Sequence, residues 1–264
     1  MGILNVTPDS FSDGGLFNAK SKAVDRAWQI AREGADILDL GGESTRPDSG
    51  GIGPQEELDR VAPVLAELAG SYPLPISIDT SKIEVARAAV ELGAAIINDV
   101  TALQHSPEIG ELAATSGAAM VLMHMRGTPK TMQKLPTSPN IIEEIEQWIA
   151  ETIARVEKLG VSSNQLILDP GIGFGKSVKQ NLEILRELSR LARAGRPLLV
   201  GTSRKSFIGA ILGKPEKDRI WGTSATVAAA ILWGAHIVRV HDVAAMREVA
   251  VMTDALAEET DNES

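Results

Sequence analysis

Acidic or amide residues stand at the ends of four short apolar runs: Asp39, Asp79, Asn98 and Asp169. One acidic residue at such a position is often only a helix N-cap, but several at one edge of a sheet can form a site. A carboxylate accepts two parallel hydrogen bonds from an amidine- or guanidine-like edge. The set therefore suits a flat heterocycle with several N–H donors, and it would stabilise positive charge that develops on such a ligand.

Two side chains that can bind an anion, Arg239 and His241, are separated by one residue near the end of another apolar run. Residues two apart on a strand point to the same face, so we expect these side chains to project together. Such a pair favours a phosphate or diphosphate site. The alternative is an ion pair between Arg239 and Asp242, three residues on, beside a histidine that belongs to the core.

A second basic segment, 203–206 (SRKS), opens a short predicted helix. The N-terminus of a helix binds anions, and Ser206 offers a hydroxyl and a backbone N–H to a carboxylate. Lys205 can donate to a carbonyl group or lay its aliphatic stem along a ring. The alternative is a solvated basic turn in which the serines act only as caps.

The glycine-rich segment 169–176 matches neither a dinucleotide fingerprint nor a P-loop in its spacing. Its glycines favour sharp backbone turns that offer Phe174 to a ligand ring, although a plain core position for Phe174 fits the spacing equally well. Asn5, at the end of the first apolar run, supplies a hard oxygen donor. Such a donor can hold Mg²⁺ when a diphosphate and water complete the coordination.

Eight short apolar runs position these residues, at 3–6, 37–40, 76–79, 96–99, 121–124, 166–169, 198–201 and 237–241. Helical patterns lie between them, at about 21–33, 54–69, 82–93, 107–116, 141–159, 180–194, 203–212, 224–233 and 243–257. Eight strand–helix units predict an α/β fold, a (β/α)8 TIM barrel with chemistry at the carboxyl ends of its parallel strands. The polar residues fall at those ends, so one pattern predicts both the fold and the site.

Length and composition fit one such barrel. The chain has 264 residues, 44% of them hydrophobic, and we expect a single domain over 1–264 with a frayed acidic tail at 258–264. The absence of cysteine excludes disulfides and thiolate metal sites. The net charge of −9 argues against nucleic acid as a partner. No apolar run is long enough to cross a bilayer and no signal peptide is evident, so we expect no membrane partner and a cytoplasmic location.

The N-terminal sequence 1–15 (MGILNVTPDSFSDGG) resembles the opening signature of the dihydropteroate synthase family. Later segments resemble further motifs of that family in the same order, at 42–47, 78–80, 97–99, 168–171, 203–206 and 239–242. The resemblance covers nearly the whole chain, and its long first motif is highly specific. One departure is Asp48, where the family usually has glycine.

The resemblance implies an enzyme of folate synthesis that joins para-aminobenzoate to 6-hydroxymethyl-7,8-dihydropterin diphosphate and releases diphosphate. By motif position, the residues that would hold the pterin are Asp79, Asn98, Asp169 and Lys205. Those that would serve the diphosphate and its Mg²⁺ are Asn5, Thr45, Arg239 and His241. Those that would frame para-aminobenzoate are Phe174, Lys205, Ser206 and Pro47. Those on loops expected to close over the site are Phe11, Asp13 and Arg46.

Within this set the catalytic roles would fall to Asp79, Asp169, Lys205, Arg239 and His241. The resemblance also implies inhibition by sulfonamides and a homodimer, for which the Ala-rich segment 224–234 offers a surface. Two alternatives stay open. One is a methyltetrahydrofolate–corrinoid methyltransferase domain, which has no need of Arg239 and His241. The other is a non-catalytic pterin-binding paralogue, which would bind pterin without turnover.

Overall fold

The computed structural model describes residues 1–7, 15–43, 51–128, 131–132 and 137–257, with the backbone alone for 15–19. Within these residues, eight parallel strands alternate with helices along the chain. The strands are β1 (Gly2–Asn5), β2 (Leu38–Gly41), β3 (Ile76–Asp79), β4 (Ile96–Asp99), β5 (Ala119–Met123), β6 (Leu166–Asp169), β7 (Leu199–Val200) and β8 (Ile237–Val238). Each lies where the sequence predicts a strand, and β7 and β8 are shorter than predicted.

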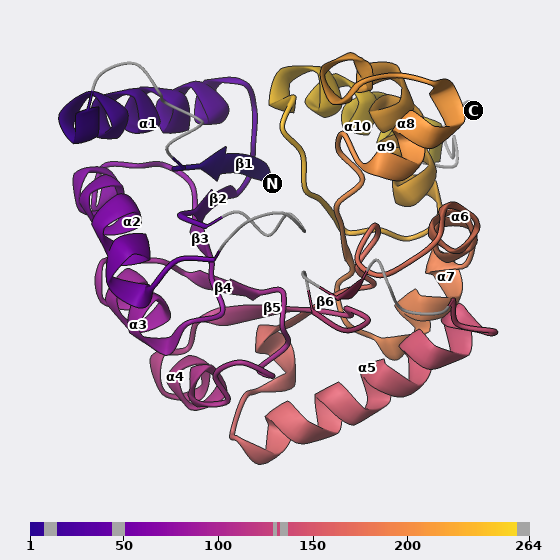
Figure 1. Cartoon of the computed structure of the whole chain (residues 1–264), viewed down its shortest axis with the longest axis horizontal. Helices are drawn as coiled ribbons and strands as arrows, with labels where there is room; N and C mark the ends of the chain where they lie inside the picture. The colour runs from indigo at the N-terminus through magenta and orange to yellow at the C-terminus, as the bar shows by residue number, and fades with distance from the viewer. Residues whose placement is uncertain (8–14, 44–50, 129–130, 133–136, 258–264) are drawn as a thin grey trace, which may run out of the picture.

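The strands form a ring in chain order. Strands β1 to β6 pair in sequence, and β7 pairs with β8. Single parallel bridges complete the ring between Leu168 and Leu198, next to β6 and β7, and between Gly2 and Val240, next to β1 and β8. The predicted (β/α)8 TIM barrel is therefore confirmed, and the strands lie at the centre of the molecule with helices around them (Figure 1).

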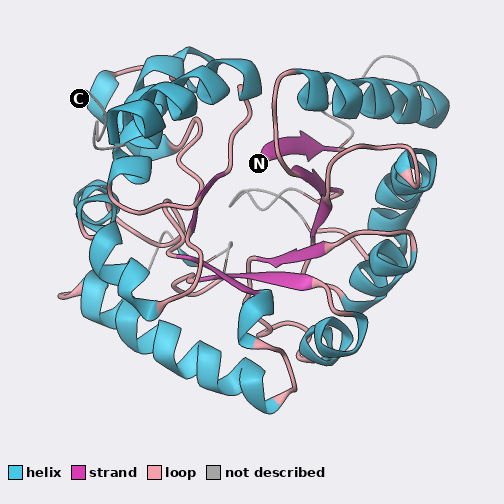
Figure 2. Cartoon of the chain, turned by 180° about the vertical axis from the view of Figure 1, so that it is seen from behind, coloured by secondary structure: helices cyan, strands magenta, loops and turns pink. Residues whose placement is uncertain are grey.

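The surrounding helices are α1 (Gly15–Arg32), α2 (Pro54–Leu68), α3 (Ile83–Glu91), α4 (Glu108–Ser116), α5 (Ile141–Lys158), α6 (Val178–Arg186), α7 (Leu188–Leu191), α8 (Ser206–Leu212), α9 (Ile220–Leu232) and α10 (Val243–Ala257). Short 3₁₀ turns occur at Ser163–Gln165, Ala192–Ala194 and Glu216–Asp218. Figure 2 shows the helical ring from behind. No helix in the described ranges is long and apolar enough to cross a membrane.

Two helices differ from the prediction. The helix expected over 180–194 begins at Val178, because Ser177 and Gln180 form a capping box, and it is interrupted at Glu187. No glycine or proline lies between 180 and 194 to signal that interruption. The helix expected from residue 203 begins at Ser206, because Arg204 has a φ of 58°, which no right-handed helix accommodates.

Alternation along the strands separates two layers of side chains. In β2, Leu38 and Leu40 belong to the large core between strands and helices, whereas Ile37 packs in a small cluster with Met1 and Val121 inside the barrel. Successive strand residues point to opposite faces, so Asp39 faces the interior together with Ile37. The interior is therefore apolar at one end and polar at the carboxyl ends of the strands, where the predicted site residues lie.

Candidate active site

Arg239 lies between two carboxylates inside the barrel. Its guanidinium donates to Asp39 at 2.6 Å and to Asp79 at 2.8 Å. Asn98 completes the group, because its amide nitrogen lies 3.4 Å from both carboxylate oxygens of Asp39. These residues come from β2, β3, β4 and the segment after β8, so barrel closure is what brings them together.

Burial and charge perturb this group in opposite directions. Burial raises the pKa of Asp79 to about 7; the positive charge of Arg239 opposes this rise, and the like charge of Asp39 adds to it. Burial opposes the charged form of Arg239, but Asp39 and Asp79 outweigh it and raise the pKa of the guanidinium. Arg239 therefore stays charged, whereas Asp79 has a raised pKa. Perturbed pKa values of this kind are typical of functional sites.

Asp169 and Lys205 form a second part of the site. Asp169 ends β6, is buried, and accepts the backbone N–H of Gly171 at 2.6 Å. Burial raises its pKa. Burial lowers the pKa of Lys205 to about 8, although Asp169 acts in the opposite direction. Phe174 is partly exposed, and the Lys205 ammonium lies 4.1 Å from the centre of its ring in a cation–π contact.

His241 is held by Ser203. The Ser203 hydroxyl accepts the backbone N–H of His241 at 3.2 Å and lies 3.0 Å from its Nδ1 atom. While it accepts the backbone N–H, the hydroxyl can donate its own hydrogen to Nδ1, and this arrangement would place the ring proton on Nε2. Burial lowers the pKa of His241 to about 4, and Arg204 and Arg239 add to this. The ring is therefore a neutral N–H donor at neutral pH.

Asp242 has a different partner from the one that the alternative interpretation of the sequence required. It binds Arg204 through two hydrogen bonds of 2.5 and 3.0 Å. Arg239 instead binds Asp39 and Asp79, so the arginine is paired, but inside the barrel. The sequence alone did not identify Asp39 as the partner, since the contact joins residues 200 positions apart.

Asn5 is exposed at the end of β1. A side chain at Gly41 would come within 3.7 Å of Asn5 Oδ1 and 3.4 Å of the Asp79 Cβ atom. Gly41 therefore leaves open the space between Asn5 and Asp79. Asn5 thus lies near the acid group and presents an amide oxygen beside it.

Two polar residues near the site serve the fold. Asp99 accepts the backbone N–H groups of Thr101 and Leu103 at 2.8 and 2.6 Å, which stabilises a turn with left-handed residues. His124 is buried against Trp148, and its Nε2 atom lies 3.6 Å from Glu144. Burial lowers the pKa of His124 to about 3, so it is neutral, and its Nδ1 atom has no hydrogen-bond partner in the part of the chain that the structure describes.

A buried ion group anchors one edge of the site. Lys82 binds the carboxylates of Glu57 and Glu43, and Glu43 also accepts the backbone N–H of Ile52 at 3.0 Å. Glu43 and Ile52 flank the segment that carries further candidate residues. The candidates Thr45, Arg46 and Pro47, and also Asp48, lie outside the described residues.

Phe11 and Asp13 likewise lie outside the described ranges, as does the predicted frayed tail. Ser206 is described and exposed as the first residue of α8, next to Lys205. The structure therefore brings Asp79, Asn98 and Arg239 into one bonded group, with Phe174 and Lys205 in contact at the same end of the barrel.

A metal ion at this site would have few protein ligands. Among the described residues, no three His, Asp or Glu side chains gather as metal ligands. Mg²⁺ usually keeps several waters and binds one or two protein oxygens together with substrate phosphates. The single exposed amide oxygen of Asn5 fits that mode of binding and does not fit a cage built by the protein alone.

Comparison with known proteins identifies the family to which this site belongs. Residues 1–241 match the family model described as pterin binding enzyme. The dihydropteroate synthase of Synechocystis sp. is 49% identical over 97% of this chain and 89% of its own length.

Solved structures agree with the sequence match. The Yersinia pestis dihydropteroate synthase, solved with a sulfonamide drug complex, has a TM-score of 0.91 and 44% identity, covering 97% of this chain and 93% of that one. The Xanthomonas albilineans enzyme, solved with 4-aminobenzoic acid, has a TM-score of 0.91 and 42% identity, covering 98% and 93%. The chain belongs to the dihydropteroate synthase family of pterin-binding enzymes, which are transferases.

Proposed function

We propose that the chain condenses para-aminobenzoate with 6-hydroxymethyl-7,8-dihydropterin diphosphate to give 7,8-dihydropteroate and diphosphate in folate biosynthesis. The observation that carries the proposal is the hydrogen-bonded group of Asp39, Asp79, Asn98 and Arg239 at the carboxyl ends of the strands. It occurs in a chain 49% identical to a dihydropteroate synthase over almost its full length.

The pterin is proposed to bind Asp79, Asn98, Asp169 and Lys205. Two buried acids offer oxygen atoms to the N–H edge of the pterin, and Lys205 donates to its carbonyl group. Burial raises the pKa of Asp79 and of Asp169. In surroundings of low dielectric constant, the hydrogen bonds that these carboxylates accept are stronger than in water. The same carboxylates would stabilise positive charge that develops on the ring.

The diphosphate is proposed to bind Asn5, Arg239 and His241, together with Thr45. The neutral His241 ring is proposed to present Nε2–H as a donor, with the Ser203 hydroxyl donating to Nδ1. Asp39 and Asp79 already bind Arg239 and hold its guanidinium in place. Arg239 would therefore stabilise the diphosphate through its positive charge. When bound, Mg²⁺ would neutralise charge on the leaving diphosphate, and Asn5 is the residue that would hold it.

Para-aminobenzoate is proposed to lie between Phe174, Lys205 and Pro47, with its carboxylate at Ser206. The Lys205 ammonium over the Phe174 ring gives this region a positive charge beside an aromatic face. The loops with Phe11, Asp13 and Arg46 are proposed to exclude water. Sulfonamides are then expected to compete with para-aminobenzoate, and inhibition independent of its concentration would contradict this.

The reaction is proposed to be S_N1-like. The bond between the methylene carbon and the diphosphate oxygen breaks first, and its electron pair leaves with the diphosphate. The amine nitrogen of para-aminobenzoate then attacks the carbon and loses a proton. This order suits a site of buried carboxylates, and a weakly nucleophilic arylamine then needs little activation by a base.

The test is product formation by the purified chain with both substrates and Mg²⁺, with dihydropteroate identified by chromatography. Product that depends on both substrates supports the synthase. Pterin binding with no product from folded protein would favour the non-catalytic paralogue. Methyl transfer from methyltetrahydrofolate to a corrinoid would favour the other alternative. The cytoplasmic location remains a prediction.

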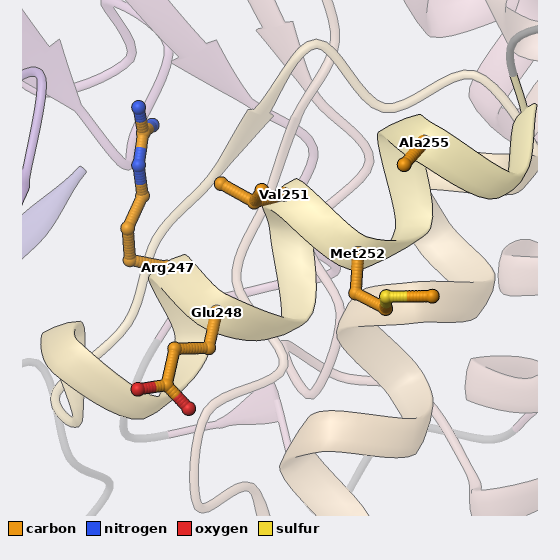
Figure 3. Close-up of a pocket in the computed structure, with 5 residues that line it drawn as sticks. All are labelled: Arg247, Glu248, Val251, Met252 and Ala255. Carbon is orange, nitrogen blue, oxygen red and sulfur yellow. The ribbon is translucent and has the colours of Figure 1, made fainter.

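We also propose a homodimer formed through α9 and α10. Large apolar side chains are exposed on this side of the barrel, with Trp221 79% and Leu256 70% accessible. A shallow pocket on α10 is lined by Arg247, Glu248, Val251, Met252 and Ala255 (Figure 3). Exposed patches of this kind mark interfaces more often than free surface.

The oligomeric state can be measured by size-exclusion chromatography with light scattering. We expect a dimer at micromolar concentration and a monomer for the Val251→Glu, Met252→Glu double variant. A wild-type monomer would contradict the proposal.

A further inference from the structure

Lys176 is a buried lysine bonded to backbone carbonyls. Its ammonium donates to the carbonyl oxygens of His124 at 3.0 Å, Gly171 at 2.9 Å and Phe174 at 3.0 Å. An ammonium has three N–H donors, so three carbonyls use all of them. Within the described residues, no carboxylate forms an ion pair with Lys176. All the hydrogen bonds of its ammonium are made to backbone carbonyl oxygens.

These carbonyls belong to two different loops of the barrel end. His124 follows β5, whereas Gly171 and Phe174 follow β6. The loops touch closely here, because a Cβ atom at Gly171 would lie 1.9 Å from the His124 oxygen. Lys176 therefore joins the loop after β5 to the loop after β6 at the place where they meet.

Asn181 fixes the remaining part of the second loop. Its side-chain oxygen accepts the backbone N–H of Gly173 at 2.6 Å, and its amide nitrogen donates to the Lys176 carbonyl at 3.3 Å. The segment from Gly171 to Lys176 is thus held from both ends by buried side chains. Phe174 is the residue that this segment presents to Lys205.

Stability alone does not explain a lysine at this position. Burial lowers the pKa of Lys176 to about 7, so the folded protein holds the ammonium less readily than water does. Asp169 and Glu144 favour the charged form, whereas Lys205 and Arg126 oppose it. An apolar residue would avoid that cost, which points to a role in geometry.

We propose that Lys176 is a positioning residue for the arylamine: its three carbonyl bonds set the place of Phe174 against Lys205. The inference rests on the proposed function, because it assigns the arylamine to the region of Phe174. It does not require Lys176 to touch a substrate.

The kinetic test compares Lys176→Met with Lys179→Met, a matched change of an exposed lysine on the first turn of α6. Lys176→Met should raise the KM for para-aminobenzoate roughly tenfold, because Phe174 would no longer be held in its place against Lys205. The KM for the pterin diphosphate and both constants of Lys179→Met should change by less than about twofold. An unchanged para-aminobenzoate KM, or equal rises in both constants, would overturn the proposal.

A double-mutant cycle tests whether Lys176 acts through Phe174. In a Phe174→Ala background, Lys176→Met should raise the para-aminobenzoate KM by less than about twofold, because the ring that it positions is gone. Multiplicative effects of the two changes would show that Lys176 acts by another route and would contradict the proposal.

Hydrogen exchange provides a measurement that does not depend on turnover. The backbone N–H groups of Gly171, Gly173 and Phe174 are all bonded, to Asp169, Asn181 and Gly171 respectively. Lys176→Met should speed their exchange while strands β1 to β4 stay protected, and Lys179→Met should leave it unchanged. Unchanged exchange in folded Lys176→Met would refute the proposal even if the wild type proved inactive.

Discussion

At the scale of single residues, Asp169 is predicted to bind the pterin. It is buried, its pKa is raised, and the only described hydrogen bond of its side chain comes from the backbone N–H of Gly171 at 2.6 Å. Replacement by asparagine keeps the size of the side chain but removes its charge. We expect Asp169→Asn to weaken the binding of a pterin by about 10-fold or more in calorimetric titration. Asp218→Asn, on an exposed turn, is the control, and equal affinity of both variants would contradict the assignment.

Ser203 provides a second prediction for a single residue. Its hydroxyl bonds both the backbone and Nδ1 of His241, so the ring should carry its proton on Nε2. Nitrogen-15 NMR of histidine-labelled protein should show an unprotonated Nδ1 in the wild type. It should show a mixture of tautomers in Ser203→Ala.

A His241→Gln sample assigns the signals of that prediction. A protonated Nδ1 in the wild type would mean that the hydroxyl accepts from the ring, and it would contradict the assignment of Nε2–H as the donor.

Residue types and order predicted much of this site. Asp79 and Asp169 end strands and Asn98 lies one residue before the end of β4, as expected, and Lys205 lies beside Phe174. The partners were harder to predict. The Arg239–Asp39 contact depends on barrel closure across 200 residues, and no local pattern encodes such a distance. The role of Lys176 depends on carbonyl groups, which every residue carries, so only coordinates could identify it.

At the scale of elements, the loop after β6 depends on one glycine. Gly171 has a φ of 70°, and a Cβ atom there would meet the His124 carbonyl. Gly195 has a similar φ of 67°, but a Cβ atom there would have no neighbour within 4 Å. The two positions therefore share the same backbone conformation and differ in the room available for a side chain.

We expect Gly195→Ala to lower the free energy of unfolding by about 1–2 kcal/mol, the cost of the left-handed conformation. Gly171→Ala should cost clearly more and should also reduce turnover, because the two loops must separate. Denaturant unfolding measures both costs. Equal losses of stability, with turnover intact, would show that the loops accommodate the methyl group.

Strand positions were predictable because short apolar runs ended by polar residues recur eight times. The interruption at Glu187 was not, since helix-forming residues continue on both sides of it. The start of α8 was also misplaced, because the left-handed Arg204 has no signal in its residue type. Local backbone conformations of this kind are imposed by tertiary contacts, here the Arg204–Asp242 pair and the bond from the Arg204 N–H to Thr223.

At the scale of the whole molecule, the buried His124 and the partly buried His241 should make the fold sensitive to acid. Burial lowers the pKa of His124 to about 3 and that of His241 to about 4. Both values lie below the unfolded value of about 6.5, so the unfolded chain binds protons that the folded chain does not. Stability is then fully present above about pH 6.5 and is lost as the pH falls toward 4, by about 3 kcal/mol for each histidine.

Urea unfolding at pH 7 and pH 4 measures this loss. His124→Gln should reduce the loss by about 3 kcal/mol. His105→Gln, at an exposed site, should leave it unchanged. If His124→Gln loses as much stability as the wild type, then His124 is accessible to protons in the folded state.

The proposed reaction requires a barrel that places acids around a carbon from which diphosphate departs. The most direct measurement is the secondary deuterium isotope effect in a single turnover, with the methylene group of the pterin diphosphate deuterated. A normal effect near the limit for carbon–oxygen cleavage before attack is the predicted result. An effect of unity would mean that para-aminobenzoate attacks as the diphosphate leaves, and it would contradict stabilisation of a free pterin cation by Asp79 and Asp169.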